Sequence, residues 1–162
     1  MNQFSTIKAL RKNIKVCTLC ADYLPNEPRP VFSFSAKSKI LIVGQAPGIK
    51  VHQSGIPWDD ASGDRLRKWI QVSKDQFYDT KLFSIVPMAF CYPGKGKSGD
   101  LPPRPECALE WMEPILDKLT QRRLTLLIGQ YSQNWFLKGT KKNTLTETVK
   151  TVSYTHLRAH ET

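Results

Sequence analysis

The chain has 162 residues, 40% of them hydrophobic and 23% charged, which is ordinary for one globular domain with a sizeable core. No apolar run approaches the roughly 18 residues of a membrane span and the N-terminus lacks a signal peptide's apolar block, so we expect a cytoplasmic protein without membrane contact. The net charge of +10 favours a polyanionic partner, nucleic acid before an anionic membrane surface, although a generally basic, well-solvated surface also explains it.

The first half of the chain reads as a helix, an extended segment, a strand and a second helix. Residues 3–16 carry apolar side chains at spacings of three and four, which predicts an amphipathic helix, and the prolines of residues 21–37 predict an extended segment. The apolar run KILIVG, residues 39–44, is typical of a buried parallel strand. A helix is predicted over residues 62–72, with Ser62 or Asp60 as N-cap and with Leu66, Trp69 and Ile70 facing inward.

The second half repeats the alternation of strands and helices. LFSIVPMAF, residues 82–90, predicts a strand in which Pro87 marks the end or an irregularity. Residues 107–119 predict a helix with Pro105 in its first turn and a kink at Pro114. A third strand is predicted over residues 124–129 and a helix over residues 130–138. We therefore expect an α/β fold, a three-layer α/β/α sandwich around a mostly parallel four-stranded sheet whose last strand is missing from the chain.

The last segment, residues 152–162, breaks with everything before it. SYTHLRAHET reads codon by codon as TCT TAT ACA CAT CTC CGA GCC CAC GAG AC, which resembles a transposase end and adapter used in preparing sequencing libraries. We therefore expect a single domain over residues 1–151, followed by a non-native tail in place of the natural C-terminus. Without this tail, His52 is the only histidine, and we expect it to be an ordinary exposed side chain.

A loop of unusual composition follows the first strand. Residues 44–66, GQAPGIKVHQSGIPWDDASGDRL, combine glycines, prolines, aspartates and a tryptophan. In parallel α/β sheets, ligands bind beyond the carboxyl ends of the strands. The loop is therefore expected to lie where such a fold binds its ligand.

The four cysteines form a second candidate site. Cys17 and Cys20 make a CxxC motif, and Cys91 and Cys107 follow with 15 residues between them. Disulfides are rare in the cytosol, so the even count indicates a metal site, with an iron–sulfur cluster or zinc as its occupant. The spacing of the later pair is unlike that of a zinc ribbon, and a lone CxxC with two buried structural thiols is the third alternative.

Loop and cysteines together resemble the uracil-DNA glycosylase superfamily, nearest to its iron–sulfur families four and five. The family-four motif GEAPGxxExxxGxPFxGxAGxLL fits residues 44–66 without a gap, and the resemblance extends over about residues 10–140. The matching motif positions are Gly44, Ala46, Pro47, Gly48, Gly55, Pro57 and Gly63. The family's cluster ligands have the spacing of Cys17, Cys20, Cys91 and Cys107, which implies a [4Fe–4S] cluster as cofactor, with zinc as the alternative.

The resemblance implies a DNA repair enzyme that hydrolyses the bond between sugar and uracil, or a related deaminated base, once the nucleotide is flipped out of DNA. We expect a monofunctional N-glycosylase of base excision repair that acts as a monomer. The base would be bound by Gly44, Gln45, Ala46, Pro47, Gly48 and Trp58. Trp58 replaces the family's phenylalanine and would stack on the base; the alternative is a core tryptophan.

The sequence departs from family four at the catalytic carboxylate. Gln45 stands where that family has glutamate, so it could hydrogen-bond a base edge or place a water but cannot serve as a carboxylate base. Family five has a D-x-S-G-D segment whose first aspartate is the proposed water activator, and that position is Asp60 here. Asp59 is the alternative activator, simple N-capping is the alternative role of Asp60, and Asp64 is expected to lie on the helix surface.

Two further departures limit what the resemblance implies. Pro87 stands where family four has an asparagine for uracil recognition, and no HPS-type histidine motif is present, so we expect this truncated chain to be poorly active. Lys95, Lys97 and Arg104 could lie along DNA phosphates, or could simply belong to a solvated loop. The alternative function is a non-catalytic nucleic-acid or lesion-binding protein with a structural four-cysteine metal site.

Overall fold

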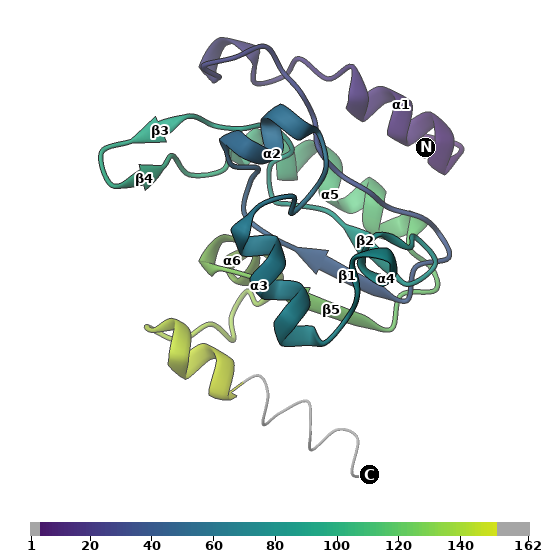
Figure 1. Ribbon diagram of the computed structural model, residues 1–162, viewed down its shortest axis with the longest axis vertical. Coiled ribbons are helices and arrows are strands. Elements are labelled where there is room, and N and C mark those ends of the chain that lie inside the picture. The colour runs from purple at the N-terminus through teal and green to yellow at the C-terminus, as the bar shows by residue number, and fades with distance from the viewer. Residues whose placement is uncertain (1–3, 152–162) are drawn as a thin grey trace.

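The computed structural model describes residues 4–151 and shows a parallel sheet with helices on both faces (Figure 1). Its strands are β1 (Ile40–Val43), β2 (Phe83–Ile85) and β5 (Leu124–Leu127), in the order β2-β1-β5. Ile40 lies opposite Phe83 on one side and Leu124 on the other, and all pairs are parallel. The predicted α/β fold is confirmed; the tail predicted from residue 152 onward lies outside the described residues.

The central strand β1 serves two cores because its side chains alternate between the faces of the sheet. Leu41 and Val43 belong to one core and Ile42 to the other, and all three are completely buried. This explains why the sequence reads as an unbroken apolar run rather than as an alternation of apolar and polar residues.

The first core lies under α1 (Ile7–Lys15) and α5 (Pro105–Lys118). The hydroxyl of Thr6 accepts a hydrogen bond from the Ala9 N–H and caps α1, and Pro105 occupies the first turn of α5, where a missing N–H costs nothing. Pro114 lies inside α5, so the helix continues through it. The two helices contact each other and cover one face of the sheet.

The second core lies under α3 (Ala61–Ile70) and α4 (Lys74–Tyr78). Leu66 is buried and Ile70 packs against this core, as the sequence predicts, but the prediction for Trp69 is wrong: it is 72% exposed. Arg67 is buried on the inward face in its place, because the inward stripe runs through positions spaced three and four apart and Trp69 falls outside it.

Several elements were not predicted from the sequence. The loop after β1 contains the short helix α2 (Ile49–Ser54), and an antiparallel hairpin of β3 (Lys95–Gly96) and β4 (Gly99–Asp100) projects from the body (Figure 1). The segment with three prolines includes a turn of 3-10 helix, η1 (Ala21–Tyr23), before it becomes extended. Helix α6 (Gln130–Phe136) follows β5 as expected, and residues 145–151 form a further helix.

Within the described residues, no helix is long and apolar enough to cross a membrane.

Candidate active site

A cavity of about 290 Å³ opens at the carboxyl end of β1. One wall comes from the 44–66 loop and consists of Gly44, Gln45, Ala46, Pro47, Gly48, Val51, Pro57, Trp58, Asp60 and Ser62. The other wall consists of Val31, Ile85, Pro87, Asp100 and Ile128. Every residue that the sequence assigns to base binding or catalysis therefore lines a single cavity.

The first turn of the loop is held by the segment that follows β2. The Met88 N–H donates a hydrogen bond to the Gly44 carbonyl, and the Ala89 N–H donates one to the Gln45 carbonyl; each is 3.0 Å long. Pro87 has no N–H and lies between the donors Val86 and Met88, so the ladder skips it while its ring lines the cavity. This backbone pairing fixes residues 44 and 45 against the sheet.

Gln45 lies against the end of β5. A Cβ at Gly129 would overlap the Gln45 amide, and Gly129 has a φ of +90°, a conformation that favours glycine. The glutamine side chain is therefore packed beside Ile128 and Gly129 while it still lines the cavity. An amide in this place can hydrogen-bond a ligand, but it supplies no negative charge.

Among the described residues that line the cavity, Trp58 alone has a left-handed backbone, with a φ of 58°. Its indole lies so close to Gly44 that a Cβ there would come within 3.0 Å of Cζ2. The ring also packs against the second core, as the alternative of a core tryptophan predicts, while it still lines the cavity. Bulky side chains rarely adopt this backbone conformation, and local strain of this kind clusters at functional sites.

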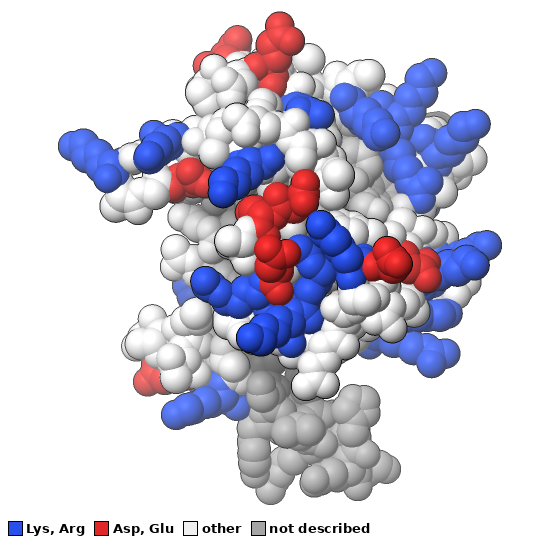
Figure 2. Space-filling model, viewed as in Figure 1, with Lys and Arg blue, Asp and Glu red and all other residues white. Residues whose placement is uncertain are grey.

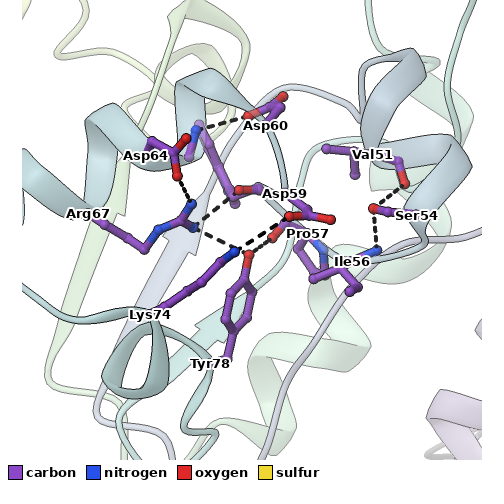
Figure 3. Close-up of polar contacts among 12 residues, drawn as sticks. Val51, Ser54, Ile56, Pro57, Asp59, Asp60, Asp64, Arg67, Lys74 and Tyr78 are labelled. Atoms are coloured by element: carbon purple, nitrogen blue, oxygen red, sulfur yellow. Dashed lines mark hydrogen bonds and ion pairs between the residues drawn. The ribbon is translucent and has the colours of Figure 1, made fainter.

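Asp60 both caps a helix and faces the cavity. One carboxylate oxygen, Oδ1, accepts a hydrogen bond of 2.9 Å from the Gly63 N–H and so caps α3 (Figure 3). The same side chain is half-buried and lines the cavity. Asp59 instead lies 4.0 Å from the Lys74 ammonium and is absent from the described cavity wall. Asp64 lies on the surface of α3, 78% exposed, in an ion pair with Arg67.

One further residue of this site has no signal in the sequence. Asp100, from the exposed hairpin, lines the cavity, and a Cβ at Gly48 would be 3.5 Å from its carboxylate. Burial and the neighbouring Asp100 carboxylate raise the pKa of Tyr92.

His52 is half-buried rather than exposed, and its Nδ1 has no hydrogen-bond partner within the described structure. The expectation of an exposed histidine is therefore wrong.

The four cysteines line a second, smaller cavity although they come from three separate segments. Cys17 follows α1, Cys20 precedes η1, Cys91 lies after β2 and Cys107 is in the first turn of α5. All four are free thiols, and Cys107 Sγ accepts a hydrogen bond from the Phe90 N–H. The donor set thus matches the four thiolates that hold an iron–sulfur cluster or a structural zinc ion.

The thiols of this cavity are not arranged around a single ion. In the described part of the chain, no three or more His, Cys, Asp or Glu side chains are placed so that they could hold a metal ion. Burial raises the pKa of Cys91 to about 11 and raises that of Cys107 as well, which disfavours bare thiolates in this cavity.

The three basic residues assigned to DNA lie in two different environments. Lys95 and Lys97 are exposed on the projecting hairpin, where basic side chains are visible on the surface (Figure 2). Arg104 is paired with Glu106, stacks on Tyr23 at 4.2 Å and lines the cysteine cavity. The lysines are therefore open to a phosphate backbone, while the Arg104 guanidinium already has partners within the chain.

The family model described as the uracil DNA glycosylase superfamily matches residues 32–160. The matched residues include both cavity walls except Val31, and they include Cys91 and Cys107 but not Cys17 and Cys20.

Proposed function

The chain belongs to the uracil DNA glycosylase superfamily, and from this premise we propose that it hydrolyses the N-glycosidic bond of uracil, or of a related deaminated base, flipped out of DNA. The observation that carries the proposal is that Trp58, Asp60 and the segment from Gly44 to Gly48 line one cavity at the carboxyl end of the sheet. An aromatic platform, a carboxylate and a close-lying backbone are what an extruded nucleotide requires.

Base binding rests on the loop. The Trp58 ring stacks on the extruded base, a contact typically worth about 1–3 kcal/mol. The glycines at 44 and 48 allow the backbone to approach the base edge, and the Gln45 amide hydrogen-bonds to it. Negative charge that grows on the departing base is stabilised by these polar groups, which are fixed before the reaction begins.

The bond is broken by water under the control of Asp60. As the bond between the sugar C1′ and the base nitrogen lengthens, positive charge develops on the sugar and the Asp60 carboxylate stabilises it. The same carboxylate aligns a water whose oxygen forms the new bond to C1′. The electron pair of the broken bond leaves with the base, and the water's proton is released. The hydrogen bond from Gly63 fixes the orientation of the carboxylate.

DNA is held outside the cavity by charge. The chain carries +10 overall, and the hairpin that supplies Asp100 to the cavity wall carries Lys95 and Lys97. A phosphate backbone lying across the hairpin would place a nucleotide near the cavity mouth, and these contacts depend on salt. We propose no DNA contact for Arg104, because its guanidinium already has partners within the chain at the cysteine cavity.

We further propose that Cys17, Cys20, Cys91 and Cys107 hold a [4Fe–4S] cluster, with zinc as the alternative. When bound, the group would act as a structural cross-link between three segments rather than as a redox centre. The chain's own contribution is the convergence of thiols from the ends of α1 and α5 and from the segment after β2.

One observation favours a second function, a non-catalytic binder of nucleic acid or lesions. The amide of Gln45 stands where family four has its carboxylate, and such a pocket could bind a base without releasing it. Asp60 distinguishes the two functions, because a binder needs no carboxylate in the cavity.

The test is excision from a labelled oligonucleotide that contains one uracil, single-stranded and duplex, followed by alkaline cleavage at abasic sites. Protein expressed from the natural gene is used, with a thymine oligonucleotide as matched substrate control. We expect cleavage at the uracil position alone. Binding of the uracil strand without cleavage would support the binder instead.

A further inference from the structure

Arg67 is buried in α3 although charged side chains are rarely buried without partners. Its side chain is 7% exposed, its Nη2 pairs with Asp64 Oδ1 at 2.8 Å, and the guanidinium lies 5.0 Å from the centre of the Phe77 ring. It is not among the described residues that line the active-site cavity. A role for Arg67 in the reaction must therefore act through another residue.

The remaining contacts of Arg67 converge on the loop that carries the stacking platform (Figure 3). Arg67 Nη1 donates a hydrogen bond of 3.2 Å to the Trp58 carbonyl and one of 3.3 Å to the Tyr78 hydroxyl. The Tyr78 hydroxyl in turn donates a hydrogen bond of 2.7 Å to the Pro57 carbonyl. Two successive carbonyls of the loop, at Pro57 and Trp58, are thus held from α3 and α4.

These contacts act on the one strained residue of the cavity. Trp58 keeps its left-handed backbone only while its surroundings force it to, since a bulky side chain disfavours that conformation. The Trp58 carbonyl lies directly over Gly63, where any Cβ would overlap it. Arg67 and Gly63 are one helical turn apart on α3 and hold this carbonyl from two sides.

We propose that Arg67 is a positioning residue that, together with Tyr78, locks the Pro57–Trp58 backbone so that the indole of Trp58 faces the base. The inference rests on the proposed function for its catalytic meaning, but the geometry it asserts is independent of any reaction. Because Asp60 caps the same helix, α3 sets both the stacking ring and the carboxylate relative to each other.

The test compares Arg67→Met and Tyr78→Phe with Arg65→Met, which removes an exposed guanidinium from the same helix. Tyr78→Phe keeps the ring and its packing and deletes only the hydroxyl, so its folding is not in question. On a uracil oligonucleotide we expect kcat/KM to fall at least about tenfold for Arg67→Met and roughly threefold for Tyr78→Phe, mainly through KM, and to stay unchanged for Arg65→Met.

A second comparison separates positioning from general stability. In a Trp58→Ala background no ring remains to be placed, so Tyr78→Phe should change kcat/KM less than about twofold. An equal loss in both backgrounds would overturn the proposal.

Crystal structures of the two variants test the geometry without any assay. We expect residue 58 to leave the left-handed region in Arg67→Met. Retention of the φ of Trp58 in both variants would overturn the inference even if the enzyme excises uracil. A wild-type protein without excision would instead refute the proposed function and leave this structural test intact.

Discussion

The active-site cavity and the cysteine cavity are built in opposite ways. Most of the first comes from one stretch, residues 44–62, whose backbone is held by the segment after β2 and whose Asp60 side chain caps α3. The second draws its four thiols from three segments, and burial raises the pKa of Cys91 and Cys107 within it. Local sequence thus builds the first site, whereas the second needs distant segments to meet.

The two regions are joined at Arg29. The backbone of Arg29 lies beside the Cys91 thiol and acts to lower its pKa, against the larger effect of burial. The Arg29 guanidinium donates hydrogen bonds of 2.6 Å to the His52 and Gln53 carbonyls at the end of α2. Gly55 leaves room for this side chain, since a Cβ there would lie 2.7 Å from Arg29 Nη2. Changes at the cysteines should therefore reach the cavity loop weakly, and changes in the cavity should leave the cysteines intact.

The largest effect is expected for Asp60→Asn. Asparagine is also a good N-cap, so α3 keeps its first turn while the carboxylate charge is lost. We expect single-turnover excision to fall by about 10²–10⁴-fold, with the content of any bound metal unchanged. Asp59→Asn, one residue away and turned toward Lys74, should retain nearly full activity. Equal losses in the two variants would remove the distinction drawn between these carboxylates.

Cys107→Ser should act first on stability and only then on activity. If the four thiols hold a cluster, iron and acid-labile sulfide disappear and the melting temperature falls by about 10 °C or more. Excision should decline less than in Asp60→Asn, because the cavity loop is connected to this site mainly through Arg29. Stoichiometric zinc in the wild type would decide for the alternative occupant, and no metal of either kind would contradict both.

Gly63→Ala tests how closely the loop is packed on α3. Alanine in a helix interior normally stabilises by up to about 1 kcal/mol over glycine, but here the Cβ would overlap the Trp58 carbonyl and lie 2.7 Å from its carbon. We expect a net loss of about 1–3 kcal/mol in the free energy of unfolding, measured by urea denaturation. Lys68→Ala, exposed on the same helix, is the control; a stabilised Gly63→Ala protein would contradict this packing.

The smallest effect is expected on the hairpin. Replacing Lys95 and Lys97 with alanine should reduce the slope of log K against log salt for duplex binding by about 2, with little effect on uracil preference. Alanine at Lys141 and Lys142, an exposed pair near the end of the described chain, is the control. An unchanged slope in the hairpin variant would exclude the phosphate contact.

The parts of the structure that follow from local patterns were predictable. Apolar runs give the three strands, and the gap-free motif after Val43 places Trp58 and Asp60 together because both follow the same strand end. Burial of Trp69 was predicted from its hydrophobicity, but the side chain is exposed. Its neighbour Arg67 fits the inward stripe and satisfies its charge through Asp64, Trp58 and Tyr78.

Contacts between distant segments could not be predicted. Asp100 reaches the cavity only because the hairpin folds back toward Gly48, and Arg29 meets α2 across more than twenty residues. The left-handed backbone of Trp58 likewise depends on Gly63 and Arg67 rather than on its own sequence neighbours. No short pattern encodes such pairs, because each residue type is compatible with many surroundings.

The most direct measurement identifies the released base by mass spectrometry after a single turnover of wild-type protein, expressed from the natural gene, on a uracil-containing oligonucleotide. We expect free uracil and an equal amount of abasic strand, both strongly reduced in Asp60→Asn. A protein that binds the oligonucleotide yet leaves uracil on the strand would contradict the proposed glycosylase function.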